Sequence, residues 1–319
     1  MQALIVFLLV FTVIVSIHEF GHFYFARKAG ILVREFAIGM GPKLFSHQGK
    51  DGVLYTIRMI PLGGYVRLAG LGEDQDAVQA GMQVGLVLNE AGLVTRINTS
   101  KVALEDEVPV QVDQLDLTDA MTITALPLGS QDLVTYQVDH KARIIEADGS
   151  SIQVAPRQVT YGAAKPWAKF MTNVAGPMNN FILSILIFVV VAFVRPGGVP
   201  VEANVLGYIE PDSPAAQAGL QAGDRIDAIG QTKVSNWRQM VQAIQSKPGQ
   251  TVDFSVHRGD QDLTLPVAIR ADQVEQATIG RIGVAQPVTQ DIWAKIAYGF
   301  TATWSQITGV AAAIVGIFL

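Results

Sequence analysis

The first residues of the chain form one long apolar run, and this run limits the possible folds more than any other feature. Residues 1–26 contain one acidic residue and no Lys or Arg, and the run is long enough to cross a bilayer as a helix. It has no basic region at its start and no small-x-small cleavage site before Arg27. We therefore interpret it as a retained membrane span and not as a signal peptide.

Near its end this run carries His18-Glu19-Phe20-Gly21-His22, the HExxH pattern. Residues four apart lie on one face of a helix, so both imidazoles can bind one metal ion with Glu19 beside it. A bound Zn²⁺ lowers the pKa of its water, and a carboxylate placed there can accept the proton. Ionisable groups are costly inside a membrane, which favours a functional site over a chance match. We predict that His18 and His22 bind zinc and that Glu19 is the catalytic base of peptide hydrolysis.

The composition excludes several other classes of protein. Half of the 319 residues (50%) are hydrophobic and only 16% are charged, which is too apolar for an ordinary soluble protein of this size. The chain has no cysteine, so thiolates cannot hold the metal and disulfides cannot form. A net charge of -5 and the absence of a nucleic-acid-binding motif argue against a nucleic-acid partner.

After the first span, alternation of apolar and polar residues from Val53 to Pro61 predicts a strand, and residues 28–72 read as a membrane-associated β-hairpin region. Gly39 and Gly41 flank Met40 in its first strand. Glycine in a strand indicates either a bulge or an exposed edge that another backbone can approach, and the sequence leaves both open.

A second uncharged apolar run, Phe170 to Val194, predicts another span, and it contains Gly176-Pro177-Met178-Asn179-Asn180. These small and amide side chains either pack the two helices together or face the metal site. The predicted segments are 1–27 (first span), 28–72 (hairpin), 73–165 (β-rich module), 166–196 (second span), 197–275 (second soluble module) and 288–319 (amphipathic or transmembrane helix).

The second soluble module carries the phrase SPAAQAGLQAGDRIDAIG at residues 213–230. This order of short helix, turn and strand closely resembles a PDZ domain of the protease-associated type, and such domains bind extended peptides by adding a strand to an exposed edge. Basic residues cluster after the first span and before the second, so the positive-inside rule predicts residues 28–168 in the cytoplasm and the PDZ domain outside.

Four features together resemble the site-2 proteases, which are bacterial intramembrane zinc metalloproteases. They are HEFGH in the first span, Gly39-Met40-Gly41 after it, Gly-Pro-x-Asn-Asn in the second span, and one PDZ domain. The likeness is strongest to the Gram-positive branch that includes the regulator-of-sigma and enhanced-expression-of-pheromone proteases. The resemblance implies that His18 and His22 bind Zn²⁺, that Glu19 is the base, and that the strand at Gly39 to Gly41 pairs with substrate. The family also has an LDG motif whose Asp is the third ligand, and this sequence has none. We therefore expect the C-terminal part of the catalytic core to be missing, which can leave this piece inactive.

The sequence thus predicts a polytopic α-helical membrane protein with a membrane-associated β-hairpin, a β-rich cytoplasmic module and an extracytoplasmic PDZ domain (α+β). The predicted function is zinc-dependent cleavage of transmembrane segments in the bacterial cell membrane. Expected partners are the lipid bilayer, peptide ligands of the PDZ domain, and single-pass membrane protein or signal-peptide substrates such as anti-sigma factors and pheromone precursors. Asn179 and Asn180 are candidate substrate-binding residues. The alternative is an inactive, membrane-anchored PDZ binding scaffold.

Overall fold

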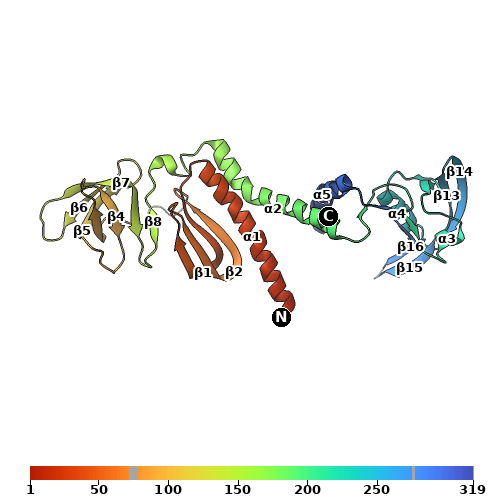
Figure 1. The fold of residues 1–319 in the computed structure, drawn as a ribbon, viewed down its shortest axis with the longest axis horizontal. Helices are drawn as coiled ribbons and strands as arrows, with labels where there is room; N and C mark the ends of the chain where they lie inside the picture. The colour runs from red at the N-terminus through yellow and green to blue at the C-terminus, as the bar shows by residue number, and fades with distance from the viewer. Residues whose placement is uncertain (72–77, 275–276, 319) are drawn as a thin grey trace. The chain divides into compact units, whose positions relative to one another are not determined.

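The computed structural model describes residues 1–71, 78–274 and 277–318, and the chain divides into two compact units, Met1–Ile182 and Leu183–Leu319 (Figure 1). The predicted boundary between residues 72 and 73, and the predicted end of the second module at residue 275, lie outside the described residues. Two described helices are long and apolar enough to cross a membrane, α1 (Gln2–Lys28) and α2 (Pro166–Val194). Their length and composition are the basis for this assignment.

In the first unit, the last turns of α1 pack on a sheet made of β1 (Val33–Gln48) and β2 (Leu54–Leu68). Aromatic and aliphatic side chains fill the space between helix and sheet, and burial of such apolar surface stabilises the contact. The buried members of this cluster are Phe23, Ala26, Ile31, Val33, Val53 and Leu68.

The β1–β2 sheet has more pairings than one hairpin contains. Residues 35–38 of β1 pair with residues 64–67 of β2 on one side and with residues 54–57 of β2 on the other. The second half of β1 then pairs with residues 54–58 alone, because the chain changes direction between Ile38 and Lys43. The ladder is irregular at this change of direction, and neither Gly39 nor Gly41 has a paired residue in it. Residues 35–38 have no free edge.

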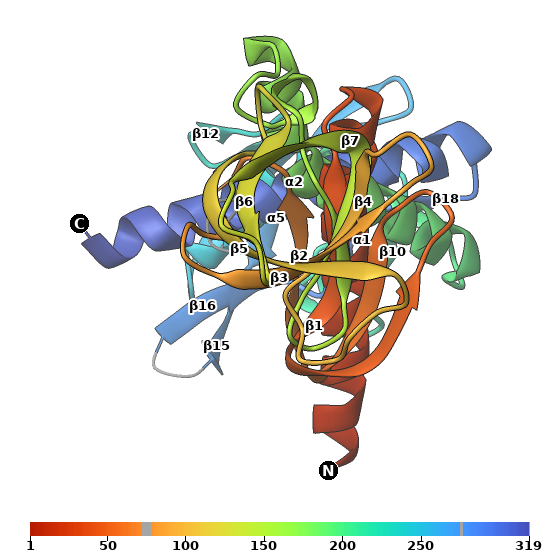
Figure 2. The ribbon, with the colours of Figure 1, turned by 90° about the vertical axis from the view of Figure 1, so that its left-hand side faces the viewer.

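The β-rich module consists of β3 (Gln83–Leu88), β4 (Val94–Asn98), β5 (Glu107–Asp116), β6 (Thr122–Pro127), β7 (Val134–Ile145) and β8 (Ser151–Gln153). The strands are ordered β4-β3-β5-β6-β7-β8, and an additional parallel pairing of β4 with β7 closes the sheet on itself. Figure 2 looks onto this barrel. Its interior is apolar, with Leu86, Ile97 and Ile123 fully buried, and a short 3-10 helix, Arg157–Val159, leads on to α2.

The second unit holds the second soluble module. Its main sheet has the order β12-β11-β13-β14, with β11 (Arg225–Ile229), β12 (Thr232–Lys233), β13 (Thr251–Arg258) and β14 (Gln261–Ala268). Two capped helices pack beside it: Ser213 caps α3 (Pro214–Gln217) and Asn236 caps α4 (Trp237–Gln245), each through its side-chain oxygen. Shorter strands complete the module, namely β9 (Val199–Pro200), β10 (Tyr208–Ile209), β15 (Arg270–Val274), β16 (Ala277–Arg281), β17 (Val284–Ala285) and β18 (Val288–Thr289).

This module extends past its predicted end at residue 275. β17 pairs with β10, and Ile282, just after β16, is buried in the same core as Phe254 and Met240. The sequence signal for this segment is the alternation of Ile282 and Val284 with polar or small residues, which is too short to stand out alone.

The last described helix, α5 (Ile292–Phe318), packs on the second half of α2. Gly299 makes this close approach possible, because a Cβ at that position would lie 2.8 Å from the carbonyl oxygen of Ile185. A hydroxyl contact of 3.1 Å between Ser184 and Thr303 joins the same faces. In the described residues α5 is not among the helices apolar enough to count as a candidate span, so a polytopic arrangement stays a prediction.

Candidate metal centre

The two apolar helices of the first unit come into close contact at the HExxH segment because each has a glycine there. A Cβ on Gly21 would lie 2.5 Å from the carbonyl oxygen of Ala175, so only glycine allows this approach. Asn179 of α2 supports the contact by donating from Nδ2 to the carbonyl oxygen of Ile17 at 3.1 Å. Asn179 therefore has the packing role that the sequence left open, and its amide is used by the helix backbone.

His22 is held in one tautomer by the second helix. Its Nδ1 lies 2.7 Å from the carbonyl oxygen of Thr172, and a carbonyl can only accept, so Nδ1 carries the proton. The lone pair of Nε2 is then free to bind a metal ion, which is the arrangement typical of histidine ligands whose other nitrogen donates to a backbone carbonyl.

His18 also has a hydrogen-bond partner on the second helix, Asn180, that can leave its Nε2 free to bind a metal ion. Its Nδ1 lies 3.1 Å from Nδ2 of Asn180, while Oδ1 of the same amide is buried and has no hydrogen-bond partner in the described part of the chain. A 180° turn of this amide brings Oδ1 next to His18 Nδ1, which can then donate to it and leave Nε2 free. Asn180 therefore contacts His18, one of the two candidate ligands, and its place in a metal site stays a prediction.

The two Nε2 atoms lie next to each other and pack against Gly176. They lie 3.2 Å apart, and a Cβ added to Gly176 would be 2.3 Å from Nε2 of His22 and 2.6 Å from Nε2 of His18. A zinc ion at about 2.0–2.1 Å from each of two nitrogens that lie 3.2 Å apart has near-tetrahedral geometry, so the spacing of the two Nε2 atoms suits zinc. These residues fit a zinc ion, and the two histidines provide two protein ligands. In residues 1–71, 78–274 and 277–318, no group of three or more His, Cys, Asp or Glu side chains is arranged so that it could hold a metal ion.

Glu19 lies where the first helix meets the sheet. A Cβ on Gly64 of β2 would be 2.9 Å from Cγ of Glu19, so the glutamate side chain passes directly over this glycine. The neighbouring Gly63 has a φ of 102° and lies under the end of Met40, whose Cε would be 2.9 Å from a Cβ there. Gly63 and Gly64 therefore bring the Gly39–Gly41 segment and Glu19 to the same place.

The Gly39-Met40-Gly41 segment has the backbone of a turn inside a sheet. Gly39 and Gly41 have φ values of 88° and 82°, a region that favours glycine, and neither has a paired residue in the described register of β1 and β2. Met40 between them is 50% exposed. The structure thus gathers all the predicted site residues into one region of the first unit.

Sequence reasoning did not single out Gly63, Gly64 or Thr172 as part of this region. Gly63-Gly64 was visible as a pair next to a strand, but its contact with Glu19 depends on how β2 packs against α1. Thr172 acts through its carbonyl group, and a backbone atom leaves no signal in the identity of a residue.

The sequence matches the family described as "Peptidase family M50" over residues 6–319. The chain belongs to this family. This confirms the resemblance to the site-2 proteases and the prediction that the chain is a metallopeptidase of a family of membrane proteases.

Curated relatives of this M50 chain come from Gram-positive bacteria. It is 42% identical over 320 residues to the "Probable protease eep" of Enterococcus faecalis, a match that covers 100% of this chain and 76% of that protein. It is 40% identical to a protein of Lactococcus lactis whose name assigns it to the zinc metalloproteases, over 98% of this chain and 74% of that protein. A similarly named protein of Streptococcus pneumoniae is 43% identical, over 94% and 71% of the two chains. These names are consistent with zinc as the metal.

Among solved structures, the PDZ domain of the SdrC-like protein from Listeria monocytogenes covers 28% of this M50 chain and 90% of its own length. The identity is 25% and the TM-score 0.24. So low a score does not decide the fold of the second module, and its PDZ identity stays a prediction.

Proposed function

We propose that the protein hydrolyses peptide bonds within membrane-embedded segments of other proteins, with His18 and His22 holding a zinc ion and Glu19 acting as the base. The observation that carries this proposal is the separation of 3.2 Å between the Nε2 atoms of His18 and His22, which suits two ligands of one zinc ion. When bound, zinc supplies an acidified water and polarises the scissile carbonyl group.

The residues around the site have separate tasks in this proposal. Thr172 and Asn180 hold the imidazoles so that their Nε2 atoms face each other. Glu19, over Gly64, accepts a proton from water and delivers it to the leaving amine. The lipid-facing helices on either side limit the access of bulk water, which strengthens the electrostatic interactions within the site.

A substrate helix must first unwind, because its carbonyl groups are internally hydrogen-bonded. We propose that the Gly39–Gly41 segment holds the unwound stretch extended by backbone hydrogen bonds. This role is supported by the absence of a paired residue for Gly39 in the described register, by the exposure of Met40, and by the contact of Met40 with Gly63, the neighbour of the glycine beneath Glu19.

Residues 28–168 are proposed to lie in the cytoplasm and the second soluble module outside it, on the basis of the distribution of Lys and Arg. Epitope tags inserted at Gly149 and at Gly259 are expected to be labelled from opposite sides of the membrane, with Gly149 on the cytoplasmic side. Both positions are exposed turns in which a Cβ meets nothing within 4 Å, so the fold tolerates the insertions. Labelling of both tags from one side would contradict the proposed topology.

The second soluble module supports a second candidate function, a membrane-anchored peptide-binding scaffold. It contains a groove of about 600 Å³ beside α4, lined among others by Trp237, Ile244 and Ile282, with Glu210 and Arg281 as charged residues. An extended peptide fits a groove of this kind through backbone pairing and side-chain pockets. In the protease proposal the groove screens substrates, so deleting residues 199–285 should relax substrate choice and leave peptide hydrolysis intact.

The proposed function predicts a metal-dependent cleavage. The full-length protein in proteoliposomes, supplied with a reporter that carries a candidate transmembrane helix, is expected to lose cleavage after treatment with a zinc chelator. Added Zn²⁺ should restore cleavage and added Mg²⁺ should not, because imidazole ligands select against Mg²⁺. Undiminished cleavage after complete removal of zinc would rule out the proposed chemistry.

A further inference from the structure

A buried ionic network lies within the β1–β2 sheet. Glu35 is 4% exposed, and its Oε1 accepts hydrogen bonds from Oγ1 of Thr56 at 2.7 Å and from Nη2 of Arg58 at 2.8 Å. Tyr65 lies beside the same carboxylate, and its own burial together with the charge of Glu35 raises the pKa of Tyr65 to about 12. The guanidinium of Arg58 lies over the Tyr65 ring, with Cζ 5.2 Å from the ring centroid. A buried carboxylate with this many partners is held in a single position.

The other end of the Arg58 guanidinium reaches the glycine segment. Its Nη1 donates to the carbonyl oxygen of Gly41 at 2.8 Å. Gly41 has no paired residue in the described ladder, so this side chain does for its carbonyl group what a neighbouring strand does elsewhere in the sheet. The backbone of Arg58 also passes Gly39, where a Cβ would be 2.9 Å from the Arg58 carbonyl oxygen.

These contacts connect Glu35 to the candidate metal centre in a few steps. Ile38, which precedes Gly39, pairs with Gly64, and Gly64 lies against the side chain of Glu19. Glycine backbones are flexible, and a flexible segment must lose conformational entropy before it can hold a substrate. A side chain that fixes the carbonyl of Gly41 in advance removes part of that cost.

We propose that Arg58, oriented by buried Glu35, is a positioning residue that keeps the Gly39–Gly41 segment in the conformation that receives substrate. This proposal rests on the proposed function, which identifies the ligand as a peptide substrate. The position of the Arg58 guanidinium comes from its own hydrogen bonds. Arginine suits the role because its planar fork can bond a carboxylate and a carbonyl group at the same time, which a lysine does less well.

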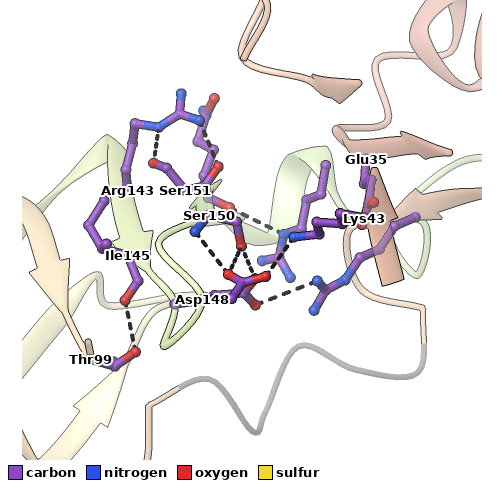
Figure 3. A network of polar contacts seen from close by, with 12 residues as sticks. Glu35, Lys43, Thr99, Arg143, Ile145, Asp148, Ser150 and Ser151 are labelled. Atoms are coloured by element: carbon purple, nitrogen blue, oxygen red, sulfur yellow. Dashed lines mark hydrogen bonds and ion pairs between the residues drawn. The ribbon is translucent and has the colours of Figure 1, made fainter. Parts of the chain in front are cut away.

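The variants must separate positioning from folding. Arg58→Gln alone leaves the Glu35 carboxylate buried without its cation, which can unfold the sheet. The double variant Glu35→Gln/Arg58→Gln removes both charges and still breaks the contact with Gly41. Arg58→Lys keeps the charge and tests partial rescue. Lys43→Gln is the matched control, because Lys43 is the strand partner of Arg58 and its own ion pair, 2.7 Å to Asp148, is partly exposed (Figure 3).

Two readouts follow the segment directly. The chain has no cysteine, so Met40→Cys gives a single site for a nitroxide label, and the line shape of its electron paramagnetic resonance spectrum reports the mobility of the segment. The second readout is the Kd for an uncleaved reporter helix, measured in a Glu19→Gln background so that binding is seen without turnover.

In the double variant we expect a more mobile label and a Kd raised about tenfold, the size expected for loss of a charge-assisted hydrogen bond. Arg58→Lys should fall in between, and Lys43→Gln should match the wild type. Zinc content and thermal stability should stay near wild-type values. An unchanged label spectrum and Kd in the double variant would overturn the proposal, as would losses in zinc content and stability that parallel the loss of binding. Failure of the wild type to cleave any reporter would refute the proposed function instead, because neither readout depends on cleavage.

Discussion

Replacing Glu19 by Gln is expected to lower the rate of cleavage by about 10²- to 10⁴-fold, the range for loss of a general base. The amide keeps the size of the side chain and its place over Gly64, so the fold should be unchanged. It cannot take a proton from water, whereas the two imidazoles that bind the metal are untouched. Zinc content should therefore equal that of the wild type while turnover is lost.

The measurement is single-turnover cleavage of the reporter helix by the full-length protein in proteoliposomes. Glu90→Gln is a suitable control, since Glu90 is an exposed carboxylate in the turn between β3 and β4 of the barrel. If the Glu19→Gln variant cleaves at the wild-type rate, hydrolysis does not use Glu19, and the peptide-binding scaffold becomes the better description of the chain.

Replacing Gly176 by Ala is expected to abolish zinc binding, and with it cleavage, while the helix remains folded. The new Cβ would lie 2.3 Å from Nε2 of His22 and 2.6 Å from Nε2 of His18, so both imidazoles must swing away from the metal position. Imidazoles can move without breaking the helix backbone, and alanine is a better helix former than glycine by about 1 kcal/mol. Thermal stability should thus fall little or rise, in contrast to the complete loss of metal.

Gly309→Ala in α5 is the matched control, because it makes the same substitution in a helix where a Cβ meets nothing within 4 Å. Zinc content and cleavage should be unchanged in it. Normal zinc occupancy in the Gly176→Ala variant would contradict a metal site in which both imidazoles keep the positions that they have here against Gly176.

The candidate metal-binding pair could be named from the sequence because its signal is local. His18 and His22 are four residues apart on one helix, and helical geometry alone brings their side chains to one face. The second span could be predicted for a similar reason, since an uncharged apolar run needs no knowledge of its neighbours. For Asn180 the sequence left two alternatives, packing between the helices or facing the metal site. An amide in a membrane helix needs a hydrogen-bond partner, but the sequence does not identify that partner.

The features that the sequence did not reveal depend on contacts between distant segments. The double-sided pairing of residues 35–38 involves two separate parts of β2, and alternation within one strand carries no information on which edges are paired. The role of Gly176 depends on the approach of α2 to α1, and that of Arg58 on a buried carboxylate on another strand. The end of the second module was placed too early because its last strands are short, so their periodicity is weak.

The most direct test of the metal centre is the zinc content of the purified protein, measured for the wild type and for His18→Ala and His22→Ala, together with zinc X-ray absorption. The wild type should hold close to one zinc ion with imidazole nitrogens at about 2.0–2.1 Å. Each substitution should lower the occupancy, and the remaining metal should be removed easily by a chelator because the described residues provide two protein ligands. Equal zinc content in the wild type and both variants would contradict a zinc site built on His18 and His22.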